Sequence, residues 1–509
     1  MDRKTMRRAS RNSVWILSGR LATQAFSLAF VVFAARELGT DRFGQYSLAV
    51  ALASYLSIGA AFGIDLHAIR EMARDPWGSS EVFTASMLTR ALLWACGMLT
   101  LLPLAFLLHQ AADVRLAVGL MAAGTLFSLL GSCGLAVLSS REEFAPRVIV
   151  EASTNLLRVA LGYAALRGGL GVPGIAGAMI VSSFCGALAG LALVRRRRVR
   201  FLTFRWRLVG TMLRRSASFG VAGILFALYF RMNVMLLPAL LDDHATGLYA
   251  ATFKVVDLWI LIPGSVAAAI YPILSRAADR SGASFTSSCR LASHGLLAVT
   301  IPFATLLAFD AGRWIDWVYG PDYATAGPCL AILVACLPLL SLNHIAGGAL
   351  YALGRARQVL LSEAIGLAAS VAAALLLIPR AGLRGAALAA VATQALVVGR
   401  NLWLLRDRFG AVVLGESLLP AVPAAFLAAA IVGPLGAPPL PRLFLGGAIY
   451  ATIWIALGGI RPIDREWLAA NAGAGRSRRL LERLGWVRQG DCGAPGKEPA
   501  RSRAAGAGR

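Results

Sequence analysis

Long apolar segments recur along the whole chain and restrict its fold more than any other feature. A helix that crosses the hydrocarbon core needs about 20 mostly apolar residues, and this criterion gives fourteen candidate spans. They are residues 12–36, 43–69, 82–109, 114–139, 147–167, 172–194, 216–240, 245–271, 285–309, 323–353, 357–379, 383–405, 417–435 and 440–460. Of the 509 residues, 58% are hydrophobic and 15% charged, which excludes an ordinary soluble domain. The sequence predicts an all-α polytopic membrane protein with about fourteen transmembrane helices.

The distribution of positive charge predicts the orientation. The chain holds 50 Lys and Arg against 26 Asp and Glu, a net charge of +24. Most basic residues lie before the first span, in the loops on that same side, and after the last span. By the positive-inside rule, both termini are then cytoplasmic. The block RRRRVR (195–200) falls in the central cytoplasmic loop. Its positive charge is explained by the orientation of the chain in the membrane and by attraction to anionic lipid headgroups, so we expect no nucleic-acid partner.

Matches in chain order predict an internal duplication. Arg11 and GQY (44–46) recur as Arg214 and GLY (247–249), and GIAGA (174–178) recurs as GLRGA (382–386). Glu151 and Glu363 occupy similar places between these markers. Each copy would contain six helices. Because six is even, both copies begin on the same side of the membrane and run parallel, as two lobes related by a pseudo-twofold axis along the membrane normal. The predicted parts are an N-lobe (1–194), a basic cytoplasmic loop (195–215), a C-lobe (216–405), two extra helices (406–460) and a basic, largely disordered cytoplasmic tail (461–509).

Charged side chains inside the predicted spans are the candidates for function, because a charge at the bilayer centre costs at least ~2.5–3.5 kcal/mol. They are Arg20, Arg90, Arg158, Arg231 and Lys254, with Asp65, Glu151, Asp257 and Glu363. Arg20 and Arg90 lie near enough to helix ends that snorkelling to the surface and facing a cavity both stay open. Lys254 and Asp257 are spaced i, i+3, so they either pair on their own helix or serve a function.

Arg231 interrupts the apolar run LYFRMNVMLL (228–237), too far from either end of its helix for snorkelling. We predict that it faces a cavity. Glu151, Asn155 and Arg158 follow one another at i, i+4 and i+7, which forms one polar stripe. A stripe of this kind lines either a helix interface or a hydrated cavity.

Two segments resemble a known family. The stretch AARELGTDRFGQYSLAVALASYLSIGAAFGIDLHAIREMARD (34–75) is similar to the N-terminal signature of bacterial oligosaccharide flippases. These are polysaccharide-biosynthesis membrane proteins of the multidrug/oligosaccharidyl-lipid/polysaccharide exporter superfamily. The stretch from Phe230 to Ala278 resembles the helix 7–8 region of that family, with Arg231, a Gly-x-Tyr at 247–249 and Pro272.

The resemblance implies that two lobes alternate access to carry an isoprenoid-pyrophosphate-linked oligosaccharide across the bacterial inner membrane. It implies a role in O-antigen or exopolysaccharide export, with a polysaccharide polymerase and export machinery as partners beside the lipid-linked substrate and membrane lipids. Arginine matches phosphate oxygens with a fork of donors. We therefore expect a substrate-binding cavity formed by Arg231, Arg20, Arg90, Arg158 and Lys254. On this hypothesis, Arg231→Ala abolishes export at unchanged protein level and Arg231→Lys restores part of it.

The sequence contains no phosphate-binding GxxxxGK[ST] loop and no cluster of metal ligands, so we expect a transporter without a cofactor. Energy then comes from H⁺, Na⁺ or the membrane potential, and the ion-coupling candidates are Asp65, Glu151, Asp257 and Glu363. The family often has an acidic residue two places after the helix 7 arginine. This chain has Asn233 there, so that position does not supply a carboxylate.

Three alternative functions stay open. A cation-coupled multidrug exporter of the same superfamily favours acidic and aromatic cavities. A peptidoglycan-precursor (lipid II) flippase shares the fourteen spans and the cationic cavity. A membrane-embedded glycan ligase or polymerase needs a large outer loop, and the longest predicted outer loops have only a few residues.

Overall fold

The computed structural model describes residues 3–75, 78–107, 112–197, 199, 206–280, 282–409 and 411–459, apart from some side chains within those ranges. The predicted tail therefore lies outside the described residues. The first helices are α1 (Arg3–Ala61), α2 (Ile64–Arg74), α3 (Ser79–Leu107), α4 (Ala112–Ser140), α5 (Phe144–Arg167), α6 (Gly171–Arg196) and α7 (Trp206–Leu240). The later ones are α8 (Asp243–Trp259), α9 (Leu261–Arg280), α10 (Gly282–Phe309), α11 (Ala311–Tyr319), the 3₁₀ helix η1 (Pro321–Ala326), α12 (Gly327–Leu333), α13 (Cys336–Ala352), α14 (Ala356–Leu404), α15 (Arg406–Phe409), α16 (Ala411–Val432) and α17 (Pro439–Ala456).

The predicted all-α membrane fold is confirmed, because helix occupies each of the fourteen predicted spans and the described residues contain no strand. Eight described helices are long and apolar enough to cross a membrane, or nine if the bent pair Pro321–Leu333 and Cys336–Ala352 is one span. Two of the long helices each contain two predicted spans. α1 turns at Gly39 (φ 71°) and α14 at Gly382 (φ 55°), left-handed conformations that glycine adopts without a steric penalty.

Three predicted spans are broken rather than continuous. The second predicted span, 43–69, ends as α1 at Ala61, and Asp65 lies in the first turn of the separate helix α2. The predicted span 245–271 is divided between α8 and α9 at Ile260, and 323–353 is divided between η1, α12 and α13. Apolar residues continue across the breaks in 245–271 and 323–353, so hydropathy alone does not reveal them, whereas α2 beyond the break at Gly63 carries several charged residues.

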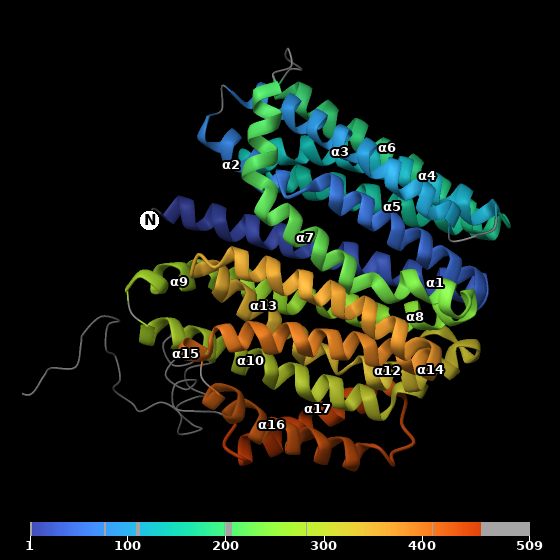
Figure 1. The fold of residues 1–509 in the computed structure, drawn as a ribbon, viewed down its shortest axis with the longest axis vertical. Helices are drawn as coiled ribbons and strands as arrows, with labels where there is room; N and C mark the ends of the chain where they lie inside the picture. The colour runs from blue at the N-terminus through green and yellow to red at the C-terminus, as the bar shows by residue number, and fades with distance from the viewer. Residues whose placement is uncertain are drawn as a thin grey trace, which may run out of the picture.

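The helices form two groups that lie one above the other in Figure 1. The N-terminal group, in blue to teal, contains α1 to α6, and the second group contains α8 to α15, with α16 and α17 at its lower margin. α7 runs from beside α2 into the middle of the molecule, and its largest contacts are with α14 and α1. We call the two groups the N-lobe and the C-lobe. The side where α1 turns back at Gly39, opposite the N-terminus in Figure 1, is called the far end.

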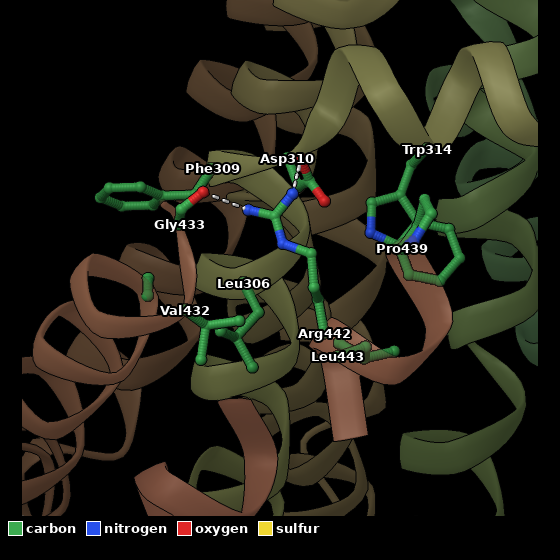
Figure 2. A pocket seen from close by; sticks show the side chains of 10 residues that line it. Leu306, Phe309, Asp310, Trp314, Val432, Gly433, Pro439, Arg442 and Leu443 are labelled. Atoms are coloured by element: carbon green, nitrogen blue, oxygen red, sulfur yellow. Dashed lines mark hydrogen bonds and ion pairs between the residues drawn. The ribbon is translucent and has the colours of Figure 1, made fainter. Parts of the chain in front are cut away.

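A buried ion pair joins the last helix to the C-lobe. The Arg442 guanidinium of α17 donates to Asp310 Oδ1 at 3.0 Å and to the Gly433 carbonyl at 2.7 Å (Figure 2). Both charged side chains are almost fully enclosed, with exposed fractions of 7% and 10%. Arg313 adds a longer contact of 3.7 Å to the same carboxylate oxygen. Asp310 therefore ties α17 to the end of α10.

Candidate functional site

A polar cavity of about 360 Å³ lies mainly inside the N-lobe. α1, α4, α5 and α6 supply most of its wall, and α8 of the C-lobe contributes Lys254. Hydroxyl and amide side chains line much of it, among them Ser27, Ser54, Ser57, Thr125, Ser128 and Asn155. Its described lining includes two basic residues and no carboxylate.

Arg158 is one of these two cations. Its guanidinium donates to Ser182 Oγ at 3.3 Å and to Ser183 Oγ at 3.2 Å, so neutral hydroxyl groups of α6 orient it. No carboxylate among the described residues forms an ion pair with Arg158. The predicted polar stripe of α5 therefore lines a cavity, with Asn155 and Arg158 side by side on its wall.

Lys254 is the second cation, and it borders two cavities at once. One is the polar cavity, and the other is an apolar cavity of about 420 Å³ between α1, α8, α10, α11 and α17. Trp259, Phe303, Trp314 and Tyr319 supply aromatic walls to the apolar cavity. Lys254 has no ion-pair partner within the described part of the chain. Its charge thus lies at the border between a polar and an apolar chamber.

Arg231 forms an ion pair with Asp257 of α8. One guanidinium nitrogen, Nη2, donates to both carboxylate oxygens, at 2.9 Å and 3.1 Å. The side chains are 26% and 16% exposed, so they are mostly enclosed. Asp257 pairs with Arg231 instead of Lys254, although Lys254 lies one turn away on the same helix. The pairing neutralises Arg231 and leaves the Lys254 ammonium without an ion-pair partner among the residues that the structure describes.

Arg90 lies away from the cavity, enclosed among helices of the N-lobe with an exposed fraction of 1%. It donates to the Leu129 carbonyl at 3.0 Å and also binds Ser132 and Asp65. It joins α3 to α4 and to the first turn of α2. The side chain of Arg20 lies outside the described residues.

The two remaining carboxylates differ in their surroundings. Glu151 forms an i, i+4 ion pair with Arg147 at 2.9 Å and borders a smaller cavity of about 120 Å³ beside Arg158. Glu363 lies inside the C-lobe, 6% exposed, and its Oε2 has no hydrogen-bond partner in the described structure. The structure thus brings Arg158 and Lys254 together at one cavity, with Arg231 and Asp257 nearby and Glu363 apart.

At the far end the two lobes are in direct contact along α1 and α8. Thr40 Oγ1 lies 2.8 Å from His244 Nδ1, which also lies 3.1 Å from Asp41 Oδ1. Gln45 donates to Asp243 at 3.0 Å, and Gly44 crosses Gly247 backbone to backbone. The matched GQY and GLY segments of the predicted duplication therefore meet each other here.

Two more links close the far end. The Arg36 guanidinium donates to the carbonyls of Trp317 and Val318 at 2.8 Å and 3.0 Å. The Tyr323 hydroxyl donates to the Ala35 carbonyl at 2.9 Å. The lobes are closed against each other on this side of the cavities.

Sequence reasoning missed the hydroxyl groups of the cavity and the pair of Arg442 with Asp310. Serine and threonine occur throughout these helices, so their presence gives no signal. Arg442 offered one signal, because it directly follows the Pro-rich turn GAPPLP and begins an apolar segment.

Comparisons with known proteins give consistent results. A family model described as "Polysaccharide biosynthesis protein" matches residues 9–278. The probable flippase AglR of Haloferax volcanii is 25% identical over 329 residues, which cover 62% of this chain and 66% of AglR. The chain thus spans just under two thirds of the length of that curated relative.

Solved structures share the fold. The lipid II flippase MurJ, in an inward closed conformation, has a TM-score of 0.67 at 13% identity, covering 87% of this chain and 97% of MurJ. An inward-facing multidrug resistance MATE family transporter of the MOP superfamily has a TM-score of 0.59 at 17% identity, covering 75% of this chain and 93% of the transporter. At these identities the similarity concerns the fold alone.

Proposed function

This chain belongs to the polysaccharide biosynthesis protein family, and from that premise we propose that it is a flippase for an isoprenoid-pyrophosphate-linked oligosaccharide. It would move this lipid across the cytoplasmic membrane by alternating access between the lobes, for export of a polysaccharide such as O-antigen or an exopolysaccharide. A polysaccharide polymerase and export machinery would act on the product. Both termini would be cytoplasmic, so the far end would face outward.

The position of Lys254 carries the proposal. A lipid-linked pyrophosphate combines a strong negative charge with a long apolar chain. Lys254 borders a polar cavity that also holds Arg158 and an apolar cavity with aromatic walls. The pyrophosphate would bind between Lys254 and Arg158, and the isoprenoid would extend into the apolar cavity. Both cations gain an anionic partner, which offsets their cost inside the membrane.

The composition of the cavity wall favours this substrate over a cationic drug. A cationic ligand would be repelled by the two cations in the described wall of the polar cavity, and that wall contains no carboxylate to compensate it. A lipid II flippase would need the same cations, so genetics must separate the two. We expect deletion of the gene to remove a surface polymer and leave the cell viable, whereas loss of a sole lipid II flippase is lethal.

The direct test is transport in proteoliposomes that contain a fluorescent isoprenoid-pyrophosphate oligosaccharide. Arg158→Ala and Lys254→Ala each remove a charge-assisted hydrogen-bond donor worth about 1.5–3 kcal/mol, so transport should fall roughly 10- to 150-fold. Lys254→Arg should keep much of the activity. Arg380→Ala provides the control, because Arg380 is exposed and its one described hydrogen bond is to the Leu376 carbonyl of its own helix. Unchanged transport by both alanine variants would exclude this headgroup site.

A further inference from the structure

The four acidic candidates within the predicted spans differ in one physical respect. Asp65 binds Arg90, Glu151 binds Arg147, and Asp257 binds Arg231. Each of these carboxylates has a cation that compensates its charge. Glu363 has no ion-pair partner among the described residues, and it is also the most enclosed of the four. An uncompensated buried carboxylate is costly when ionised, and taking up a proton removes that cost.

Glu363 lies on α14 where this helix packs against α7. The hydroxyl of Tyr229 on α7 lies beside the carboxylate, and neither the hydroxyl nor Glu363 Oε2 meets hydrogen-bond geometry with any described partner. Tyr351 of α13 is the other titratable group that faces Glu363, with Tyr271 of α9 beyond it. Cys336 of α13 lies beside Tyr229. Among the described groups that face Glu363, none is basic.

Tyr229 also borders a cavity of about 20 Å³, which is large enough for one water molecule. Several polar atoms of its lining have no hydrogen-bond partner in the described structure: Tyr229 Oη, Asn233 Oδ1, Thr393 Oγ1 and Gln394 Nε2. Their side chains are 3–5% exposed. A buried water normally makes two to four hydrogen bonds with such groups. The cavity therefore has both the room and the partners to hold one.

We propose that Glu363 takes up and releases a proton in the transport cycle, with Tyr229 as its hydrogen-bonding partner and with one water as the partner of Tyr229, in the cavity that Tyr229 borders. The inference rests on the proposed flippase function and adds the coupling ion to it. The proton binds at Glu363 Oε2, which has no hydrogen-bond partner in the described structure, so the carboxyl alternates between a neutral and an ionised form. The ionised form needs donors, and the Tyr229 hydroxyl is a described donor that lies beside it.

This exchange can move α7 because Tyr229 and Arg231 lie on the same helix, two residues apart. Tyr229 faces Glu363 and α14, while Arg231 holds Asp257 of α8 close to Lys254. Ionisation of Glu363 favours a shorter contact with Tyr229, and a shift of α7 changes the position of the Arg231–Asp257 pair. The proton site would thereby act on the headgroup site without touching the substrate.

The experiment compares Glu363→Gln, which is always neutral, with Glu363→Asp, which still titrates. Transport of the fluorescent lipid-linked oligosaccharide is measured in proteoliposomes with and without an imposed pH difference. The wild type and Glu363→Asp should respond to the pH difference, and Glu363→Gln should lose the response while keeping a residual rate. Asp407→Asn is the control, because Asp407 is an exposed carboxylate whose only described partner is Arg406.

A second measurement does not depend on transport. Infrared difference spectra of the wild type against Glu363→Gln should show a protonated-carboxyl band that disappears as the pH rises. A full pH response in Glu363→Gln, a response to a sodium gradient alone, or absence of the band would each overturn the proton inference. A wild type that shows the band but moves no lipid-linked oligosaccharide under any gradient would instead refute the flippase proposal.

Discussion

Gly44 of α1 and Gly247 of α8 cross so closely that a methyl group on either would collide with the other segment. A Cβ on Gly44 would lie 2.0 Å from the Asp243 carbonyl oxygen, and one on Gly247 would lie 2.0 Å from the Thr40 carbonyl oxygen. Only glycine allows this backbone approach, in the manner of small-residue helix contacts. The contact of the lobes at the far end therefore depends on two missing side chains.

We predict that Gly44→Ala and Gly247→Ala each weaken this contact. Overpacking of a tight contact costs about 1–3 kcal/mol, so the state closed at the far end should become roughly 5- to 150-fold less populated. A single cysteine at Thr40 then reacts faster with an impermeant thiol reagent added from outside. Gly59→Ala is the control, since a Cβ there meets nothing within 4 Å. Equal labelling of all variants would contradict the prediction.

Replacing Arg231 should let Lys254 form an ion pair with Asp257. Arg231→Ala leaves Asp257 without its partner, and Lys254 lies one turn away on the same helix. Asp257 then captures the ammonium group that borders the cavities, and transport falls through the loss of a free Lys254 charge. The double variant Arg231→Ala/Asp257→Asn removes this competitor and should regain transport. A double variant no more active than Arg231→Ala would show that Arg231 acts directly.

Arg90→Met should reduce stability rather than substrate binding. Arg90 is enclosed and binds Leu129, Ser132 and Asp65, so its loss removes the links between three helices. Arg90 is enclosed but Asp65 is 45% exposed, so solvent screens the pair and the loss of these contacts should cost roughly 1.5–3 kcal/mol. The detergent-solubilised protein should unfold at lower temperature, while transport per folded molecule stays near that of the wild type. Arg70→Ala, an exposed change on α2, is the matched control. A selective loss of transport at normal stability would assign Arg90 to the substrate.

Asp310→Asn should loosen α17. The substitution removes the charge that Arg442 needs and leaves its guanidinium enclosed with little compensation. We expect the free energy of unfolding to fall by roughly 3–5 kcal/mol and proteolysis between α16 and α17 to become faster. Asp316→Asn, an exposed change on α11, should leave both unchanged. Undiminished resistance of Asp310→Asn to protease would contradict this assignment.

The sequence predicts the helical architecture well because apolar length is a local property. A run of about 20 apolar residues has few alternatives in a bilayer. The break at Ile260 is less visible, since the residues on both sides stay apolar. Gly39 and Gly382 are two of many glycines, and only the three-dimensional structure identifies the turns they form.

The site is less predictable because it depends on which distant residues meet. Asp257 is 26 residues from Arg231, and the choice between Arg231 and Lys254 as its partner is decided by helix packing. Arg90 and Arg158 are both arginines within predicted spans, and the sequence does not show which groups each one contacts. Their environments differ because Arg90 finds Asp65 and carbonyl groups, whereas Arg158 finds serines at a cavity wall.

The pair of Arg442 with Asp310 also bears on biosynthesis. The two residues are 132 positions apart, so at about 5–20 residues per second the ribosome makes Asp310 roughly 7–26 s before Arg442. During that interval Asp310 has the longer contact with Arg313, but the enclosed guanidinium that approaches it more closely does not yet exist. Chains that terminate early keep this defect, which would distinguish them from finished molecules for membrane proteases.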